Sequence, residues 1–179
     1  MKIGVTGNIG SGKTFLCRKL QEHGFKVMFS DEVVRDIYIS HQDKLVDIYG
    51  DDVLTKGIID KKKASTKFFS DKAIKHKVET LIKELVYKRF LDEQPDFFES
   101  AVIFEMNIES WFDRLILVEA PINLRIERIL KRDNCTIEQA MLKINSQIQH
   151  KHENFDFIYN NNFEALFQYL EHDICRKQS

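Results

Sequence analysis

The feature that most constrains this chain is a glycine-rich loop near its start, within the stretch GVTGNIGSGKTF that begins at Gly4. Residues 7–14 satisfy the pattern G-x-x-x-x-G-K-S/T and hold three of the seven glycines of the chain. A short apolar run, KIGV, precedes the loop and has the pattern of a buried strand, whereas helical spacing begins at Thr14. A strand, this loop and a helix in that order predict a phosphate-binding loop (P-loop); a purely structural glycine turn is the weaker alternative.

The residue types of this P-loop suit a nucleotide phosphate. Glycines let successive backbone N–H groups face one concavity, and the helix that follows adds unsatisfied amides and the positive end of its dipole. Lys13 would bring a full charge to the β- and γ-phosphates of ATP, and the Thr14 hydroxyl is placed to ligate Mg²⁺. The predicted ATP-binding residues of the loop are Gly7, Asn8, Ile9, Gly10, Ser11, Gly12, Lys13 and Thr14.

The bulk composition indicates one globular domain. The 179 residues are 43% hydrophobic and 31% charged, and their formal charge of −1 gives no reason to expect a nucleic acid or a membrane as partner. Cys17, Cys135 and Cys175 lie far apart and form no CxxC pair, so we expect neither a disulfide framework nor a zinc site. A cytoplasmic protein, monomeric or weakly homo-oligomeric, is the expectation.

Five apolar runs of strand length alternate with helical patterns, which predicts a doubly wound α/β domain with a mainly parallel sheet. Besides KIGV, the expected strands are Lys26–Ser30, Ala101–Phe104, Leu115–Val118 and Phe157–Asn160. Apolar residues between Ile74 and Phe90 step by three and four, which predicts a long amphipathic helix. Helices are also expected over 33–39, over 123–132, from Thr136 with Gln139 in a capping box, and from Phe163.

Three further expectations concern the middle of the chain and its histidines. The run Lys61–Lys63 is interpreted as a solvated turn, with a substrate contact as the less favoured alternative. Four phenylalanines are assigned to the core, with an interface as the less favoured alternative: Phe68, Phe69, Phe97 and Phe98. The H-x-H spacing of His150 and His152 favours a polar turn over a metal site.

Two carboxylates and an arginine-rich segment are candidates for phosphoryl transfer. Asp31 follows the second expected strand and Glu105 follows the third, at the sheet edge where ligands bind, although an Asp in that place can also be a helix cap. The segment NLRIERILKRD carries arginines on related helical turns, which favours a lid over phosphate rather than a merely exposed basic face. No N-K-x-D element of a guanine-nucleotide switch is present.

The order of these parts resembles the dephospho-CoA kinase family from Lys2 to about Leu170. IGVTGNIGSGKT resembles the opening loop of the family, VMFSDEVVRDIY the segment with its proposed base, and ESAVIFE its strand with a terminal glutamate. NLRIERILKRDNCTIEQAMLKINSQI is similar to the family lid, with Gln147 on a matching position, and HKHENFDFIYNN to the family ending. The chain departs from the family pattern where Lys83 and Glu84 replace a His-Pro pair.

The resemblance implies a P-loop nucleotide kinase fold with a helical acceptor-binding insert and a helical lid. It implies a core of about 1–30, 96–122 and 153–179, an acceptor-binding region of about 31–95 and a lid of about 123–152. The activity implied is transfer of the ATP γ-phosphoryl group to the 3′-hydroxyl of dephospho-CoA, with Mg²⁺. Kinase action on another nucleoside-like acceptor and a non-catalytic nucleotide sensor remain alternatives.

The same resemblance implies roles for residues outside the loop. Asp31 is the expected base, and Arg128 acts with Lys13 on the transferred phosphate. Arg132 and Asn160 are expected to bind ATP, the latter near the adenine. Asp31, Arg35 and Glu105 are expected to bind the acceptor.

Overall fold

The computed structural model describes residues 1–148 and 150–176 of the chain. The chain divides into two compact units. The first unit contains residues 1–27 and 95–179, and the second contains residues 28–94.

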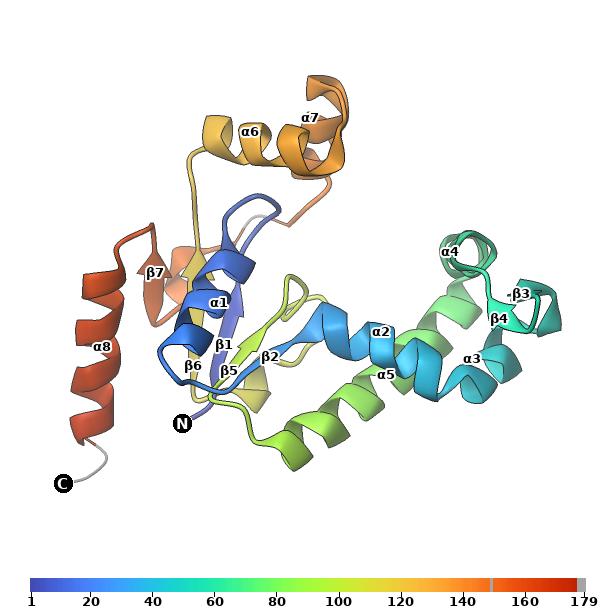
Figure 1. Ribbon diagram of the computed structural model, residues 1–179, viewed down its shortest axis with the longest axis horizontal. Coiled ribbons are helices and arrows are strands. Elements are labelled where there is room, and N and C mark those ends of the chain that lie inside the picture. Colours follow the sequence, from blue (N-terminus) through green and yellow to red (C-terminus); the bar gives the residue numbers. More distant parts are fainter. Residues whose placement is uncertain (149, 177–179) are drawn as a thin grey trace. The chain divides into compact units, whose positions relative to one another are not determined.

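A five-stranded sheet with the strand order β2-β5-β1-β6-β7 forms the centre of the α/β fold (Figure 1). The central strand β1 (Ile3–Thr6) pairs in parallel with β5 (Phe97–Glu99) and β6 (Arg114–Val118), and β6 pairs in parallel with β7 (Phe157–Tyr159). Strand β2 spans Val27–Phe29. The sheet confirms the predicted five-stranded parallel α/β fold.

The apolar runs of the sequence form the core of the first unit. Every residue of β1 is buried, as are the consecutive residues Ile116, Leu117 and Val118 of β6. Burial of consecutive residues means that both faces of the sheet are covered, because side chains alternate along a strand. The helices of this unit are α1 (Lys13–Glu22), α6 (Ile122–Asp133), α7 (Ile137–Asn145) and α8 (Phe163–Arg176), and its 3₁₀ segments are Glu109–Trp111 and His152–Asn154.

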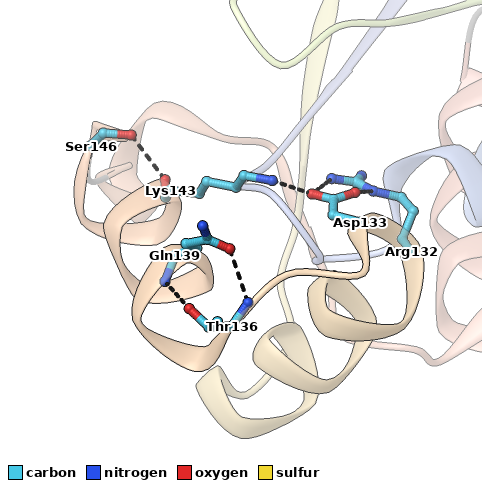
Figure 2. A network of polar contacts seen from close by, with 6 residues as sticks. All are labelled: Arg132, Asp133, Thr136, Gln139, Lys143 and Ser146. Carbon is cyan, nitrogen blue, oxygen red and sulfur yellow. Dashed lines mark hydrogen bonds and ion pairs between the residues drawn. The ribbon is translucent and has the colours of Figure 1, made fainter.

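Helices α6 and α7 form a pair with a small apolar core of their own. Ile129, Ala140 and Ile144 are buried in it. The predicted capping box starts α7: the Thr136 hydroxyl accepts from the Gln139 N–H at 3.3 Å, and the Gln139 side chain accepts from the Thr136 N–H at 3.0 Å (Figure 2). The box satisfies two amides that would otherwise lack a partner at the helix start.

The second unit is mainly helical, as expected. The long helix α5 (Lys72–Glu93) buries Val78, Ile82, Val86 and Phe90, which is the predicted apolar stripe. Three other helices of this unit pack against α5. The other elements are α2 (Ser30–Ser40), α3 (Gln42–Tyr49), a 3₁₀ turn (Asp51–Val53), the hairpin strands β3 (Leu54–Thr55) and β4 (Ile58–Ile59), and α4 (Lys61–Ser70).

Three expectations from the sequence are wrong. Residues 101–104 form no strand; the strand lies earlier, at Phe97–Glu99, and a turn follows it. The lysines 61–63 are not a turn but the first turn of α4, because the Asp60 side chain caps that helix by accepting from the Lys62 and Lys63 amides. Phe97 and Phe98 lie in the core as predicted, whereas Phe69 is 78% exposed.

Within residues 1–148 and 150–176, none of the helices combines the length and apolarity that crossing a membrane requires.

Candidate active site

The P-loop connects β1 to α1, as its pattern predicted, and its glycines are required by close backbone packing. Gly7 has a φ of +148°, and a Cβ there would lie 2.3 Å from the Val118 carbonyl oxygen. Gly10 has a φ of +77°, and a Cβ there would lie 2.8 Å from the Arg125 carbonyl oxygen. Both positions are closed to other residues by conformation and by space.

Two of the loop amides expected to face phosphate donate within the protein instead. The Ile9 N–H donates to the Gln147 side-chain oxygen at 2.6 Å, and the Ser11 N–H donates to the Asn8 carbonyl at 3.1 Å. In this conformation, therefore, the amides of Ile9 and Ser11 are not directed at a ligand. The side chain of Lys13 lies across the loop, where its Nζ donates to the Gly7 carbonyl at 2.6 Å.

Arginines of α6 bind the carbonyl groups of the P-loop. Arg128 donates through Nη1 to the carbonyls of Gly10 and Ser11, at 2.9 Å each. Arg125 donates through Nε to the Ile9 carbonyl at 2.9 Å, and burial lowers its pKa against the opposing influence of Glu119. The predicted lid therefore contacts the loop directly.

The Ile9 side chain joins this contact as well, because it packs on the small core of α6 and α7. A single P-loop residue thus meets the lid through its side chain, its N–H and its carbonyl.

Arg132 binds the last residue of its own helix and lies outside the cavity lining. It donates to both carboxylate oxygens of Asp133, at 2.6 and 3.1 Å, and Lys143 of α7 donates to the same carboxylate at 2.5 Å (Figure 2). Arg132 and then Lys143 hold the pKa of Asp133 well below its usual range. Asp133, the last residue of α6, thus binds Arg132 of its own helix and Lys143 of α7.

A cavity of about 540 Å³ opens between the P-loop, α6 and the loop after β7. It is lined by Asn8, Ser11, Gly12, Phe15, Leu117, Val118, Glu119, Ala120, Pro121, Leu124, Arg125, Arg128, His150, Tyr159, Asn160 and Asn161. Asn160, predicted to lie at the nucleotide, is in this lining, and Arg132 is not.

Several polar atoms of the lining are buried without a hydrogen-bond partner in the described part of the chain. They are Ser11 Oγ, Arg125 Nη2, His150 Nε2 and Tyr159 OH. Buried polar atoms are rarely left unpaired, so this set suits a polar ligand that supplies the missing partners. Burial also lowers the pKa of His150, which keeps the ring neutral near pH 7.

The second unit has its own cavity, of about 980 Å³, in which the predicted residues Asp31 and Arg35 lie. Asp31 is in the first turn of α2, but the N-cap of that helix is Phe29, so the capping alternative does not hold. The rest of the lining is largely apolar or aromatic and includes Tyr38, Phe68 and Phe69. Lys83 and Glu84, on α5, lie outside this lining.

Two carboxylates, one at the end of β5 and one after it, differ from what the sequence suggested. Glu105 lies exposed in a turn rather than at a strand end. Glu99, which the sequence analysis passed over, is the last residue of β5 and is only 6% exposed.

Comparison with known proteins agrees with this arrangement. The family model for dephospho-CoA kinase matches residues 1–165. The chain belongs to the dephospho-CoA kinase family. A dephospho-CoA kinase of Fusobacterium nucleatum subsp. nucleatum is 32% identical over 184 aligned positions, which cover 96% of this chain and 95% of that protein.

Solved structures share the fold of this dephospho-CoA kinase family member. TT1252 from Thermus thermophilus matches with a TM-score of 0.84 at 22% identity, over 98% of this chain and 97% of that one. The dephospho-CoA kinase from Campylobacter jejuni matches with a TM-score of 0.60 at 24% identity, over 100% of this chain and 98% of that one.

In this member of the dephospho-CoA kinase family, the arginine spacing that predicted the lid includes Arg125, but only Arg128 and Arg132 of that helix were expected at the site. Arg125 and Arg128 lie three residues apart on α6, so they share a face, and both line the cavity. Glu99 did not stand out in the sequence, because the strand that it ends was placed four residues too late.

Proposed function

We propose that the chain transfers the γ-phosphoryl group of ATP to the 3′-hydroxyl of dephospho-CoA, giving CoA and ADP. The observation that carries the proposal is the joint lining of one polar cavity by the P-loop and the arginines of α6, in a chain of this family. ATP use is what the family implies, and the unpaired polar atoms of the cavity suit its phosphates and ribose.

The roles of the residues follow from where charge develops during transfer. Lys13 and Arg128 lie at the loop and offset negative charge that builds on the phosphates. Arg125 binds and orients the loop through the Ile9 carbonyl. Asn160 borders the nucleotide from the loop after β7, and Arg132 acts only through the lid in the conformation described.

Thr14, in the first turn of α1, is the expected protein ligand of Mg²⁺. No group of three or more His, Cys, Asp or Glu residues suited to a metal occurs within residues 1–148 and 150–176. A P-loop site fits that finding, since Mg²⁺ there takes most of its oxygen ligands from phosphate and water. When bound, Mg²⁺ would offset the charge of the β- and γ-phosphates.

The second unit is assigned to the acceptor, as residues 31–95 were in the sequence analysis. Its cavity combines an apolar, aromatic lining with Asp31, Arg35 and Lys61. Asp31 would orient the acceptor hydroxyl and accept its proton, while the cationic side chains would face acceptor phosphates. Glu105 remains a proposed acceptor contact. The proposal includes a reducing cytoplasmic setting, in keeping with the free thiols of Cys17 and Cys135.

The deciding experiment is a coupled ADP-release assay with ATP, Mg²⁺ and purified protein, with and without dephospho-CoA. ADP release that depends on dephospho-CoA is expected, and a panel of other nucleoside-like acceptors should give much slower release. Faster release with another acceptor would move the proposal to that substrate. Tight ATP binding with no transfer to any acceptor would indicate a nucleotide sensor.

The variant Asp31→Asn tests the proposed base in the same assay. Turnover should fall by about 10²-fold or more, in line with typical general-base contributions, while ATP affinity stays unchanged. Asp36→Asn is the matched control, because Asp36 lies on the same helix α2 and forms a salt bridge with Arg89. Full activity of Asp31→Asn would show that the base lies elsewhere.

A further inference from the structure

His150 brings a ring nitrogen without a partner to the cavity beside the P-loop. It lies between α7 and the 3₁₀ segment His152–Asn154, and it lines the cavity together with Asn8, Ser11 and Gly12 of the loop. Its Nε2 atom is buried and makes no hydrogen bond in the described part of the chain. A buried polar atom in this state is unfavourable, so a partner supplied by a ligand would stabilise it.

Two phenylalanine rings hold the imidazole of His150 in place. The centroid of the Phe104 ring lies 5.8 Å from that of the imidazole, and the Phe155 ring stands nearly perpendicular to it, at 5.6 Å and 89°. Aromatic pairs at such separations and angles are favourable. Neither phenylalanine offers an oxygen or a nitrogen to Nε2, so the ring is held while its hydrogen bond is left to another group.

His150 belongs to the phosphate end of the cavity. The side chain of Gln147, three residues earlier, accepts from the Ile9 N–H of the P-loop at 2.6 Å. Three residues span at most about 11 Å, so this bond keeps His150 near the loop. Two other unpaired polar atoms lie there: Ser11 Oγ is in the loop, and Arg125 Nη2 belongs to the guanidinium whose Nε binds the Ile9 carbonyl. All three side chains can donate to phosphate oxygens.

The surroundings of the ring favour its neutral form while no ligand is bound. Burial is the main cause that lowers the pKa of His150, and Lys13 lowers it further. Glu105 and Glu119 act in the opposite direction, but Glu119 is bound by His152 at 2.9 Å. The charged groups around the ring come from the P-loop, the turn after β5, the end of β6 and α6: Lys13, Glu105, Glu119, Arg125 and Arg128. A bound phosphate chain would add negative charge and favour the protonated ring.

We propose that His150 binds a phosphate oxygen of the nucleotide through Nε2 and takes up a proton as ATP binds. The proton comes from solvent, Nε2–H donates to the phosphate oxygen, and no covalent bond of ATP changes. The charge of the imidazolium then adds to those of Lys13 and Arg128. ATP affinity should therefore rise as pH falls, because the complex holds this proton more tightly than the free protein does. The inference rests on the proposed use of ATP but needs no acceptor.

The test compares the ATP affinities of the wild type and His150→Gln by calorimetry, with Mg²⁺ and without an acceptor. Titration of ATP itself affects both proteins equally, so the ratio of their affinities isolates the histidine. The difference should be small at about pH 8, whereas the wild type should bind about 10-fold more tightly at about pH 5.5, as a pKa rise of about one unit requires. His23→Gln is the matched control, because His23 packs on Phe167 and is not in the cavity lining. Its affinity relative to the wild type should not change with pH.

Nuclear magnetic resonance of the histidine rings gives a second readout. The signal missing in His150→Gln identifies His150, whose pKa should rise by about one unit when ATP is added to the wild type. An affinity ratio that does not change with pH, or an unchanged pKa of His150, would overturn the inference. If His150→Gln does not fold, His150→Phe replaces it, since it keeps a ring beside Phe104 and Phe155, and it should show the same loss. Absence of ATP binding by the wild type would overturn both proposals, whereas failure of dephospho-CoA as acceptor would overturn only the proposed function.

Discussion

Replacement of Gly10 by alanine tests whether contact between the P-loop and α6 governs nucleotide binding. Gly10 has a φ of +77°, where an L-residue costs about 1–2 kcal/mol. The new Cβ would also lie 2.8 Å from the Arg125 carbonyl oxygen and 3.0 Å from the Arg125 Cα. Both atoms are backbone, so only a shift of the loop or of α6 relieves the contact, at a further cost of about 1–3 kcal/mol.

Gly24→Ala is the matched control for Gly10→Ala. Gly24 belongs to the same unit, has a φ of +91° and has nothing within 4 Å of a built Cβ. In Gly24→Ala the free energy of unfolding should fall only by the cost of a positive φ, about 1–2 kcal/mol, and ATP affinity should stay unchanged. In Gly10→Ala the free energy of unfolding should fall further, because the steric contact adds to that cost.

ATP affinity should separate the two variants more sharply than stability. Moving α6 displaces Arg125 and Arg128 from the cavity they line, so the steric cost should appear in binding. A loss of about 1–3 kcal/mol corresponds to roughly 5- to 150-fold weaker binding. The assays are denaturant unfolding and ATP calorimetry of both variants. Equal ATP affinities for Gly10→Ala and Gly24→Ala would refute the reasoning.

Two further predictions concern the lid and its return to the sheet. Thr136→Ala removes the cap of α7 and should lower the free energy of unfolding by about 1 kcal/mol, measured as a drop in melting temperature. The control is Thr66→Ala, an exposed change in the middle of α4, which should lower the melting temperature less. His150 has a pKa lowered first by burial, with Glu105 and Glu119 acting to raise it and Lys13 to lower it. Its contribution to stability should be present above about pH 6.5 and lost as pH falls through the lowered pKa, because the unfolded chain takes up the proton first. His150→Phe, which keeps a ring beside Phe104 and Phe155, should flatten that decline in melting temperatures between about pH 7 and 5; an identical pH slope would contradict this.

The sequence predicted correctly those elements whose structure is decided by residues close together in the chain. The P-loop was predictable because the phosphate-binding backbone needs glycines at fixed spacing, between a strand and a helix. The capping box at Thr136 and the apolar stripe of α5 followed for the same reason: each is decided within a few residues.

Elements decided by distant contacts were harder to predict. The stretch from Phe97 to Phe104 holds two apolar runs on either side of Glu99 and Ser100, and periodicity alone favours the longer one. Pairing of Phe97 with Ile3 and of Glu99 with Val5 decides in favour of the first run. The misplaced strand also put Glu105 at a strand end, whereas the structure has it in an exposed turn; its role as an acceptor contact stays a prediction.

The expected role of Arg132 in ATP binding came from the family resemblance, and it stays a prediction. The sequence did not show that Arg132 would bind a carboxylate of its own helix in the conformation described. Lys143 reaches the same carboxylate, that of Asp133, only once α7 has packed against α6.

The way Ile9 meets the lid has a consequence for how mutation can alter this enzyme. Two of its three links are main-chain groups, the N–H held by Gln147 and the carbonyl held by Arg125. Every residue type except proline supplies both groups, so almost any change of side chain at position 9 would leave them in place. The two main-chain hydrogen bonds between the P-loop and the lid should therefore survive most substitutions of Ile9. Any ligand that reorients this peptide changes lid docking, and by thermodynamic reciprocity lid docking changes the affinity for that ligand by the same factor.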